Sequence, residues 1–359
     1  MLHQSAVYSG DAFAYSLPGG FAKTAPWPPR ASDARAPTPT AVAQADSDRT
    51  LIVTDVACDL PAQWLAAGKV AVAPLRLRFD SRSRSDTGDV EAALDFFQHD
   101  LDGVGHDAQA LPLSVSGTQE FIHERLQAET DFVLDVSLAS HRGSGYMNSL
   151  TAAQNLMLQH GRVRRQAGVQ RPFKMWVVDS TAAFNGHGVL VTEGVRALGE
   201  GAAMPRVVQQ LDALRKHVHT LAIPRDASFF HRHSRIDGDA AVNWLSIGMG
   251  KVLDRTPILH AHANMLAVAA QARSHDAAIA RAFAATAQAV ATCLLAPGVC
   301  MSYAGDVAEV RQWPGFTALE EACVQHRVAL HLGTMSMTNA VHLGRGALSI
   351  AFAAESPVL

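Results

Sequence analysis

Three stretches of the sequence place polar side chains directly after predicted strands. "TDVACD" contains Asp55 and Asp59, "SLASHRGSG" contains Ser140, His141 and Arg142, and "VDSTAAFNGHG" follows a further strand. In an open parallel sheet, ligands bind outside the carboxyl ends of the strands. These turns therefore rank first among the candidate sites.

Each turn allows a binding role or a purely structural one. Asp55 can orient a ligand hydroxyl or backbone group, or it can cap the helix that follows. The serines and backbone N–H groups of residues 137–149 precede a predicted helix and suit a carboxylate or phosphate, with an ordinary capped helix as the alternative. Neither a GxxxxGK[ST] loop nor a GxGxxG fingerprint after the first strand occurs, so we expect no nucleotide cofactor.

Histidines are dense in "HRH", with His231 and His233, and in "HAHA", with His260 and His262. In a strand, His260 and His262 share one face, which fits two metal ligands and equally fits a polar sheet face. Because no HEXXH helix or Cys/His ligand set occurs, we expect no metal, and a metal-dependent hydrolase remains the weakest alternative. A serine hydrolase is poorly supported because no G-x-S-x-G elbow occurs.

Composition narrows the class of protein. The 359 residues exceed what one core of roughly 250–300 residues serves, and 48% are hydrophobic. A net charge of −3 gives no support for a nucleic-acid partner. Four cysteines form no CxxC pair, no apolar run reaches the roughly 18 residues of a membrane span, and no secretory signal is recognisable. We therefore expect a cytoplasmic protein without an integral membrane segment.

The hydrophobic pattern predicts an α/β fold in two domains. Residues 1–49 are rich in Pro, Ala, Ser and Asp and are expected to form an extension. Over residues 50–218, strands alternate with helices, which predicts a parallel-sheet α/β/α three-layer domain. Here "VAVAPLRLRF" reads as one strand, and Ser116 and Gln119 form a capping box at a helix start. Residues 219–359 are expected to form a smaller α/β sandwich domain, with helices at 238–252 and about 273–292 and a small sheet of late strands.

Several stretches, in sequence order from about residue 51 to 354, resemble the DegV family. "TDVACDLP" is similar to the family's TDS-x-x-DLP, and "APLRLRF", "SDTGDV" and "LPLSVSGTQEF" to its next strand, acidic-glycine segment and hydroxyl-rich loop. "SLASHRGSGYMNS" and "VDSTAAFNGHG" are similar to its serine-glycine turn and its VDS strand end. "HRHSRIDG" and "AVHLGRGALSIAF" are similar to its Gly-Gly-Arg-Ile-Ser turn and its closing strand.

The resemblance implies a fatty-acid-binding protein that is not itself an enzyme. Some proteins of the family act as the carrier subunit of a bacterial fatty acid kinase, and the same role is expected as an option here. An acyl chain would lie in the first domain, with its carboxylate near the domain boundary. A separate kinase subunit resembling dihydroxyacetone kinases would phosphorylate that carboxylate for phospholipid synthesis. The positions that match the family's head-group residues are Ser114, Ser140, Arg235 and His342.

The chain departs from the family pattern around the expected carboxylate site. Val56 and Ala139 stand where the family has serine, and Ser114 stands where it has threonine. Basic residues stand where the family has none, at His141, Arg142, His233 and Arg345. Either arginines now hold the carboxylate, for which their planar fork is suited, or the ligand is more anionic. Asp55 and Arg345 would support the site. The alternative function is an enzyme that acts on a small carboxylate or phosphate substrate through His342, Arg235 and Arg142.

Overall fold

A four-stranded parallel sheet forms the first part of the fold. The computed structural model describes residues 47–359 except 80–81, 106–107, 234–254 and 357–358. Sheet A has the strand order β2-β1-β6-β7. Its strands are β1 (Thr50–Asp55), β2 (Val70–Ala73), β6 (Phe132–Ser137) and β7 (Lys174–Asp179), and every neighbouring pair is parallel. The predicted parallel sheet is confirmed, and the carboxyl ends of its strands share one edge.

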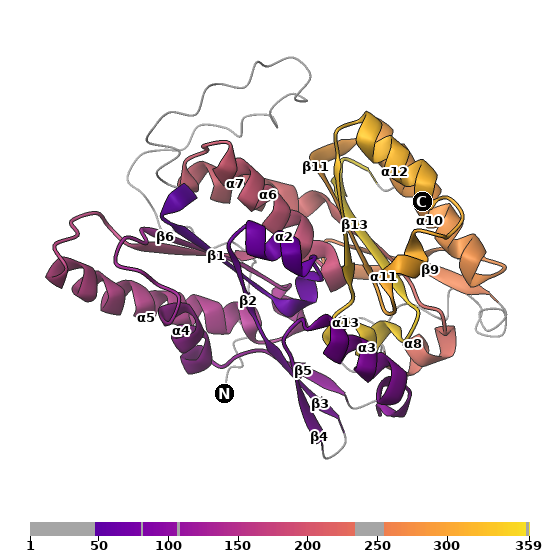
Figure 1. The fold of residues 1–359 in the computed structure, drawn as a ribbon, viewed down its shortest axis with the longest axis horizontal. Helices are drawn as coiled ribbons and strands as arrows, with labels where there is room; N and C mark the ends of the chain where they lie inside the picture. Colours follow the sequence, from indigo (N-terminus) through magenta and orange to yellow (C-terminus); the bar gives the residue numbers. More distant parts are fainter. Residues whose placement is uncertain (1–46, 80–81, 106–107, 234–254, 357–358) are drawn as a thin grey trace, which may run out of the picture. The chain divides into compact units, whose positions relative to one another are not determined.

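Helices cover both faces of sheet A, which confirms the predicted three layers (Figure 1). On one face lie α4 (Val115–His123) and α5 (Gly145–Gln166), and on the other lie α2 (Ala62–Ala67), α6 (His187–Gly199) and α7 (Met204–Leu214). The residues buried between sheet A and the pair α4 and α5 are called here the α4–α5 layer. Its members are Val53, Ile122, Val133, Ala153, Leu156, Phe173 and Met175.

A six-stranded mixed sheet forms the second part. Sheet C has the order β10-β9-β8-β13-β11-β12, and β11 with β12 is its parallel pair. Helices α10 (His275–Thr292) and α12 (Phe316–Gln325) pack on one face, and α6 contacts the other. The strands are β8 (Val218–Ile223), β9 (Thr256–His262), β10 (Met265–Ala272), β11 (Leu294–Tyr303), β12 (Ala329–Thr334) and β13 (Leu348–Ala354).

Sheet C differs from the small sheet that the sequence predicted. It has more strands than sheet A, whereas the sequence predicted a smaller sheet. The sequence did not predict β10, because its alanine-rich sequence "MLAVAAQA" has little β-branched character. Strand β8 begins next to the predicted domain boundary, and α10 matches the predicted helix at 273–292. The predicted helix at 238–252 lies outside the described residues. Helices α8 (Ala227–His233), α11 (Val307–Val310) and α13 (Met337–Leu343) lie near the ends of sheet C strands.

A third sheet, β4-β3-β5, corrects the prediction of one strand over "VAVAPLRLRF". That stretch divides at Pro74 into β2 of sheet A and β3 (Leu75–Phe79) of the small sheet, which pairs with β4 (Arg82–Asp86) and β5 (Gln109–Leu111). Proline has no N–H to donate to a ladder, so pairing with one partner stops there. After Pro74 the chain enters the small sheet because β3 alternates apolar and charged residues. Its apolar residues are buried in the core, and Arg76 and Arg78 between them are exposed.

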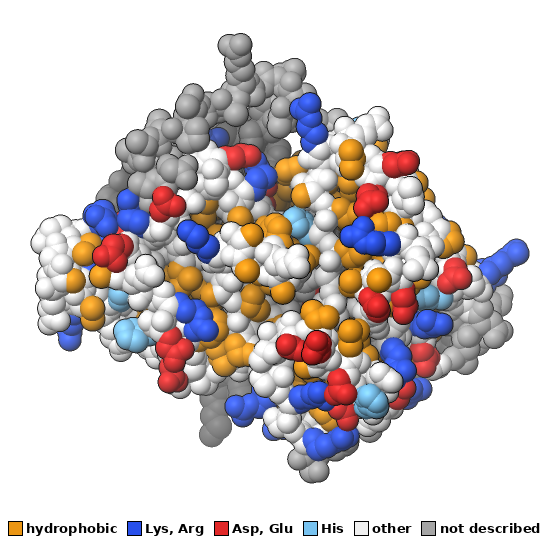
Figure 2. Space-filling view, in the orientation of Figure 1, with side chains coloured by type: hydrophobic (Ala, Val, Ile, Leu, Met, Phe, Trp, Pro, Cys, Tyr) orange, Lys and Arg blue, Asp and Glu red, His pale blue; other side chains and the backbone are white. Residues whose placement is uncertain are grey.

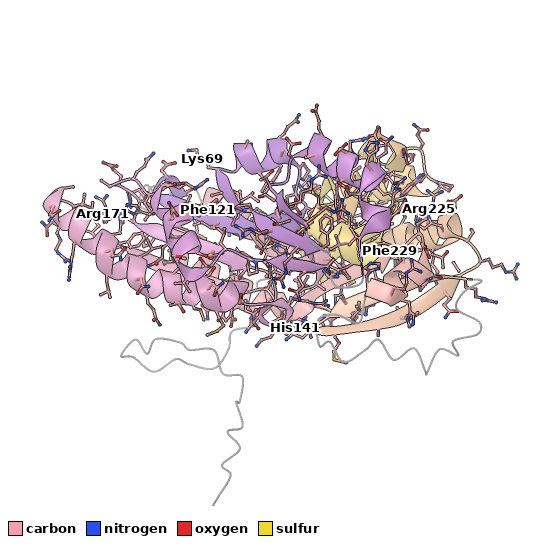
Figure 3. All side chains as sticks on the ribbon, turned by 90° about the horizontal axis from the view of Figure 1, so that it is seen from below. Lys69, Phe121, His141, Arg171, Arg225 and Phe229 are labelled. Atoms are coloured by element: carbon pink, nitrogen blue, oxygen red, sulfur yellow. The ribbon has the colours of Figure 1, made fainter. Side chains whose placement is uncertain are left out.

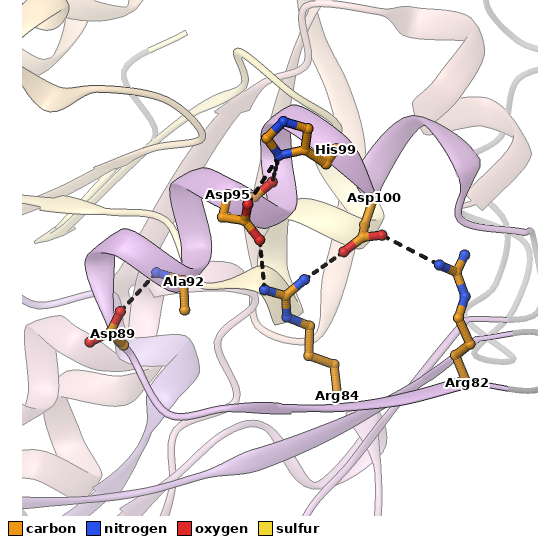
Figure 4. Close-up of polar contacts among 7 residues, drawn as sticks. All are labelled: Arg82, Arg84, Asp89, Ala92, Asp95, His99 and Asp100. Carbon is orange, nitrogen blue, oxygen red and sulfur yellow. Dashed lines mark hydrogen bonds and ion pairs between the residues drawn. The ribbon is translucent and has the colours of Figure 1, made fainter.

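Helix α3 (Val90–His99) is fastened to β4 by charged side chains (Figure 4). The Arg84 guanidinium lies 3.0 Å from an Asp95 carboxylate oxygen and 2.5 Å from one of Asp100, and Arg82 lies 3.4 Å from Asp100. Asp89 caps the helix by accepting from Ala92 N–H at 2.8 Å. Figure 2 shows positively and negatively charged side chains gathered at the lower part of one face, over β3, β4 and α3, whereas hydrophobic side chains reach the surface near β2. None of the helices in the described ranges is long and apolar enough to span a membrane.

Candidate functional site

At the end of β1, Asp55 links the turn after this strand to the turn after β6 by hydrogen bonds. Asp55 caps the short 3-10 helix Val56–Cys58 by accepting from Ala57 N–H at 3.0 Å. Its other carboxylate oxygen accepts from Leu138 N–H, just beyond β6, at 3.1 Å. The capping alternative for Asp55 is therefore observed, and the same carboxylate also fixes the turn that follows β6.

His187, which the sequence interpretation missed, is the ionisable partner of Asp55. It is fully buried at the start of α6, and its Nε2 lies 3.2 Å from Asp55 Oδ1. Burial would raise the pKa of Asp55, but the charge and hydrogen bond of His187 outweigh it and hold that pKa below its ordinary value. Burial likewise would lower the pKa of His187, and the charge of Asp55 raises it. Only its place within "VDSTAAFNGHG", after a strand, signalled it in the sequence.

The turn after β6 carries Ser140, His141 and Arg142 in a short 3-10 helix immediately before α5. The Ser140 backbone N–H donates to Asp179 Oδ1, at the end of β7, at 3.1 Å. All three residues are half-buried, and the Arg142 guanidinium carbon lies 5.9 Å from the centre of the Phe184 ring. Asp179 therefore holds this turn at the carboxyl edge of sheet A.

Ser114 is the N-cap of α4, which corrects the predicted capping box at Ser116. Its hydroxyl accepts from Gly117 N–H at 3.1 Å and lies 3.0 Å from the Ser116 hydroxyl. Ser114 has the extended backbone that an N-cap requires, whereas Ser116 already lies inside the helix. On α5, the Asn148 side-chain amide donates to Leu113 O at 2.7 Å. This bond draws the start of α4, with Ser114, toward the start of α5 and the Ser140 turn.

Helix α13, which carries His342, is attached to the turn after β1 through Asp59. Ser336 N–H and the Asn339 side-chain amide donate to the two Asp59 carboxylate oxygens at 2.8 and 2.9 Å. The Asn339 amide also donates to Ala57 O at 2.9 Å. His342 is half-buried and lies three residues beyond Asn339, a neighbouring position on the helix surface. Burial raises the pKa of Asp59 to about 6.

The other predicted head-group residues are placed differently. Arg345 is exposed and lies against the end of α3, where its guanidinium donates to Gln98 O at 2.8 Å and lies 3.3 Å from Asp102. Arg235 lies outside the described residues. In the view of Figure 3, His141 lies at the lower edge, below Phe121 of α4 and Phe229 of α8. The structure thus gathers Asp55, Ser114, Ser140, His141 and Arg142 at one edge of sheet A, with α13 attached beside it.

The histidines considered as metal ligands have protein partners. His233 contacts Phe229 O at 2.8 Å and Val104 O at 3.1 Å through its two ring nitrogens. His260 Nε2 lies 2.9 Å from His219 Nδ1, and His262 Nδ1 lies 3.0 Å from Val218 O. In the part of the chain that the structure describes, no group of three or more His, Cys, Asp or Glu is arranged to hold a metal ion.

Comparison with known proteins places the sequence in a family. Residues 49–355 match the family model described as "Uncharacterised protein, DegV family". A DegV domain-containing protein of Xanthomonas campestris pv. campestris is 32% identical over 304 residues, which cover 85% of this chain and 97% of that protein. A second, of Xanthomonas axonopodis pv. citri, is 30% identical with the same coverage.

Solved structures share the fold at lower identity. A DegV lipid binding protein from Thermotoga maritima superposes with a TM-score of 0.65 at 17% identity, covering 86% of this chain and 99% of that one. A DegV family protein from Thermus thermophilus, described by its fatty acid binding, gives 0.64 at 21% identity with coverage of 85% and 99%. DegV from Bacillus subtilis, described as a fatty acid binding protein, gives 0.63 at 16% identity with coverage of 86% and 99%.

Proposed function

Because the chain belongs to the DegV family, we propose that it binds a long-chain fatty acid at the carboxyl edge of sheet A. The carboxylate would lie at the starts of α4 and α5, and the acyl chain would run into the α4–α5 layer. The observation that carries the proposal is the Asn148 bond of 2.7 Å to Leu113 O, which draws the two helix starts together. Solved relatives described as lipid or fatty acid binding support it.

The head-group end offers donors suited to a carboxylate. Helix starts present free backbone N–H groups and a partial positive charge, and both α4 and α5 begin here. Ser114 and Ser140 add hydroxyls, and Arg142 adds a guanidinium that can bind a carboxylate bidentately. The two nearby aspartates are already engaged, Asp55 with His187 and Asp179 with backbone N–H groups of Ser140 and Thr181. A carboxylate bound here would therefore have donors close to it.

The α4–α5 layer offers an apolar environment for the acyl chain. Its buried residues come from β1, β6, α4, α5 and β7 with the preceding Phe173, and Phe121, Leu126 and Met157 pack against them partly buried. Burying a chain in such surroundings gains about 0.8 kcal/mol per methylene. Flexible side chains such as Met can change conformation, so those of this layer can make room for an acyl chain.

The carrier role completes the proposal. In this role the protein is not itself catalytic and presents the carboxylate to a separate cytoplasmic kinase subunit that resembles dihydroxyacetone kinases. His342 would stand near the head group, because α13 is attached to the turn after β1 through Asp59 and Ala57. Arg235 is the second basic residue proposed for this step. The acyl phosphate formed would feed phospholipid synthesis.

Mass spectrometry of a solvent extract of freshly purified protein tests the binding function directly. A long-chain fatty acid present in about equal amount to the protein is the expected result. An extract without fatty acid from folded protein, together with no uptake of added fatty acid, would refute the proposal. Added ATP and a fatty acid kinase subunit should then yield acyl phosphate from the loaded protein, whereas the loaded protein alone should yield none.

A further inference from the structure

An acidic residue, Asp135, faces the otherwise apolar α4–α5 layer. In β6 its partner across the ladder is Val53 of β1, a member of that layer. The preceding residue, Leu134, points to the other face of sheet A, toward α6. A Cβ added to Gly194 of α6 would lie 3.3 Å from the Leu134 side chain. Because neighbouring residues of a strand point to opposite faces, Asp135 points toward α4 and α5. It is 4% exposed.

Two hydroxyl residues face the same end of the layer. Ser149 of α5 is the hydrogen-bond partner of Asp135 and lies four residues before Ala153, a layer member. Thr118 of α4 lies four residues before Ile122, also a layer member. Residues four apart share a helix face, so both hydroxyl side chains point toward the layer, and both are buried.

The surroundings of Asp135 are unusual for a structural carboxylate. Burial raises its pKa to about 7, although the hydrogen bond from Ser149 opposes the rise. A carboxylate has two oxygens with about four acceptor sites, more than one serine hydroxyl can fill. Burial of a carboxyl group is unfavourable unless hydrogen bonds compensate for it. A ligand that supplies a further hydroxyl would provide that compensation.

We propose that Asp135, Ser149 and Thr118 form a subsite for a hydroxyl group on the acyl chain, so that the ligand is a fatty acid hydroxylated close to its carboxyl end. This inference rests on the proposed fatty-acid-binding function. The ligand hydroxyl would donate to Asp135 and accept from a serine or threonine hydroxyl. No covalent step is involved.

The depth of the subsite indicates where on the chain the hydroxyl lies. Asp135 is two residues before the end of β6, or about 7 Å at roughly 3.3 Å per residue. Ser149 is four residues beyond the start of α5, or about 6 Å at roughly 1.5 Å per residue. Both distances are measured from the edge where the carboxylate is proposed to bind. They correspond to the first few carbons of the chain, and not to its far end.

Binding of three acids to delipidated protein, measured by isothermal titration calorimetry, tests the subsite. The acids are tetradecanoic acid, 3-hydroxytetradecanoic acid and 12-hydroxytetradecanoic acid. We expect the 3-hydroxy acid to bind about tenfold or more tightly than the other two, since a hydrogen bond to a charged or buried group has at least this effect. Asp135→Val should abolish the preference and strengthen binding of tetradecanoic acid. Ser149→Ala should reduce the preference and serves if Asp135→Val does not fold.

The outcomes separate the two proposals. If tetradecanoic acid binds wild-type protein as tightly as the 3-hydroxy acid, the hydroxyl subsite is refuted and fatty acid binding stands. If the 12-hydroxy acid gains as much as the 3-hydroxy acid, the hydroxyl is recognised elsewhere and the subsite is also refuted. If the folded protein binds none of the three acids, both proposals fail together.

Discussion

Asp59 accepts a hydrogen bond of 2.9 Å from the side-chain amide of Asn339, although the two residues are 280 positions apart. Asp59 follows the first strand of sheet A, and Asn339 lies in α13, between β12 and β13 of sheet C. Ser302 and Ser336 donate to the same carboxylate at 2.7 and 2.8 Å. A single buried carboxylate therefore determines where α13, and with it His342, lies relative to the turn after β1.

Asp59→Ala should destabilise the protein because it leaves three buried donors without their acceptor. We expect the free energy of unfolding to fall by about 3–5 kcal/mol, as when one partner of a buried polar pair is removed. Chemical denaturation with urea measures this. Asp102→Ala is a matched control, because that carboxylate is 73% exposed and faces Arg345 across the surface. Equal small losses in both variants would contradict the role given to Asp59.

Gly333→Ala should be destabilising for a steric reason. A Cβ at Gly333 would lie 2.2 Å from the Asp59 carbonyl oxygen, a backbone atom that cannot move aside freely. Overpacking of this kind costs about 1–3 kcal/mol. Gly199→Ala is the control: it is a helix position where a Cβ meets nothing within 4 Å, so the variant should be neutral or more stable. Thermal melting of both variants measures the difference, and an unchanged melting temperature for Gly333→Ala would show that the strand end and the turn can separate.

The local hydrophobic pattern of the sequence was enough to predict sheet A and the turns at the carboxyl ends of its strands. Strands β1, β6 and β7 are short apolar runs followed by turns and helices, and parallel order then follows from the length of the connections. Pairing over long distances was not predictable in this way. Asp59 reads as a turn residue, and its bonds to Ser302 and Asn339 depend on the packing of sheet C. His187 was missed for the same reason, since its partner Asp55 comes from another strand.

Three stacked histidines should make the protein sensitive to acid. His219 is on β8, which lies between β13 and β9 in sheet C. Its Nε2 lies 3.3 Å from Ala354 O and its Nδ1 lies 2.9 Å from His260 Nε2. Its ring centre lies 4.2 Å from that of His262. Burial, followed by the charges of His262 and His260, lowers the pKa of His219 to about 4. The unfolded chain therefore binds the proton first as pH falls. Stability should be lost between about pH 6.5 and pH 4.

His219→Phe should weaken this pH dependence, because the group that titrates differently in the two states is removed. Urea denaturation at pH 7.5 and pH 5 measures the change in unfolding free energy for each protein. The exposed His326→Phe serves as the control and should lose as much stability on acidification as wild type does. An equal loss in wild type and His219→Phe would mean that the acid sensitivity arises elsewhere.

Arg142→Ala should weaken binding of the fatty acid head group. Arg142 lies in the turn held by Asp179 and stacks near Phe184, beside the starts of α4 and α5. Loss of a charged hydrogen bond of about 1.5–3 kcal/mol corresponds to a rise in Kd of roughly tenfold to a hundredfold. Arg142→Lys should recover part of the affinity, since it restores the charge without the planar fork. Arg78→Ala, on the exposed face of β3, is the control and should leave Kd unchanged.

His342→Ala should separate binding from phosphoryl transfer. The side chain is half-buried on α13, which is fixed to the turn after β1 by Asn339 and Ser336, so the variant should fold and keep the position of the helix. If His342 acts when the carboxylate is presented, acyl phosphate formation with a fatty acid kinase subunit should fall at least tenfold, while Kd for the fatty acid changes less than about threefold. A parallel loss of both would place His342 among the binding groups, and no loss of either would remove it from the site. His326→Ala, an exposed histidine at the end of α12, controls for loss of a histidine as such.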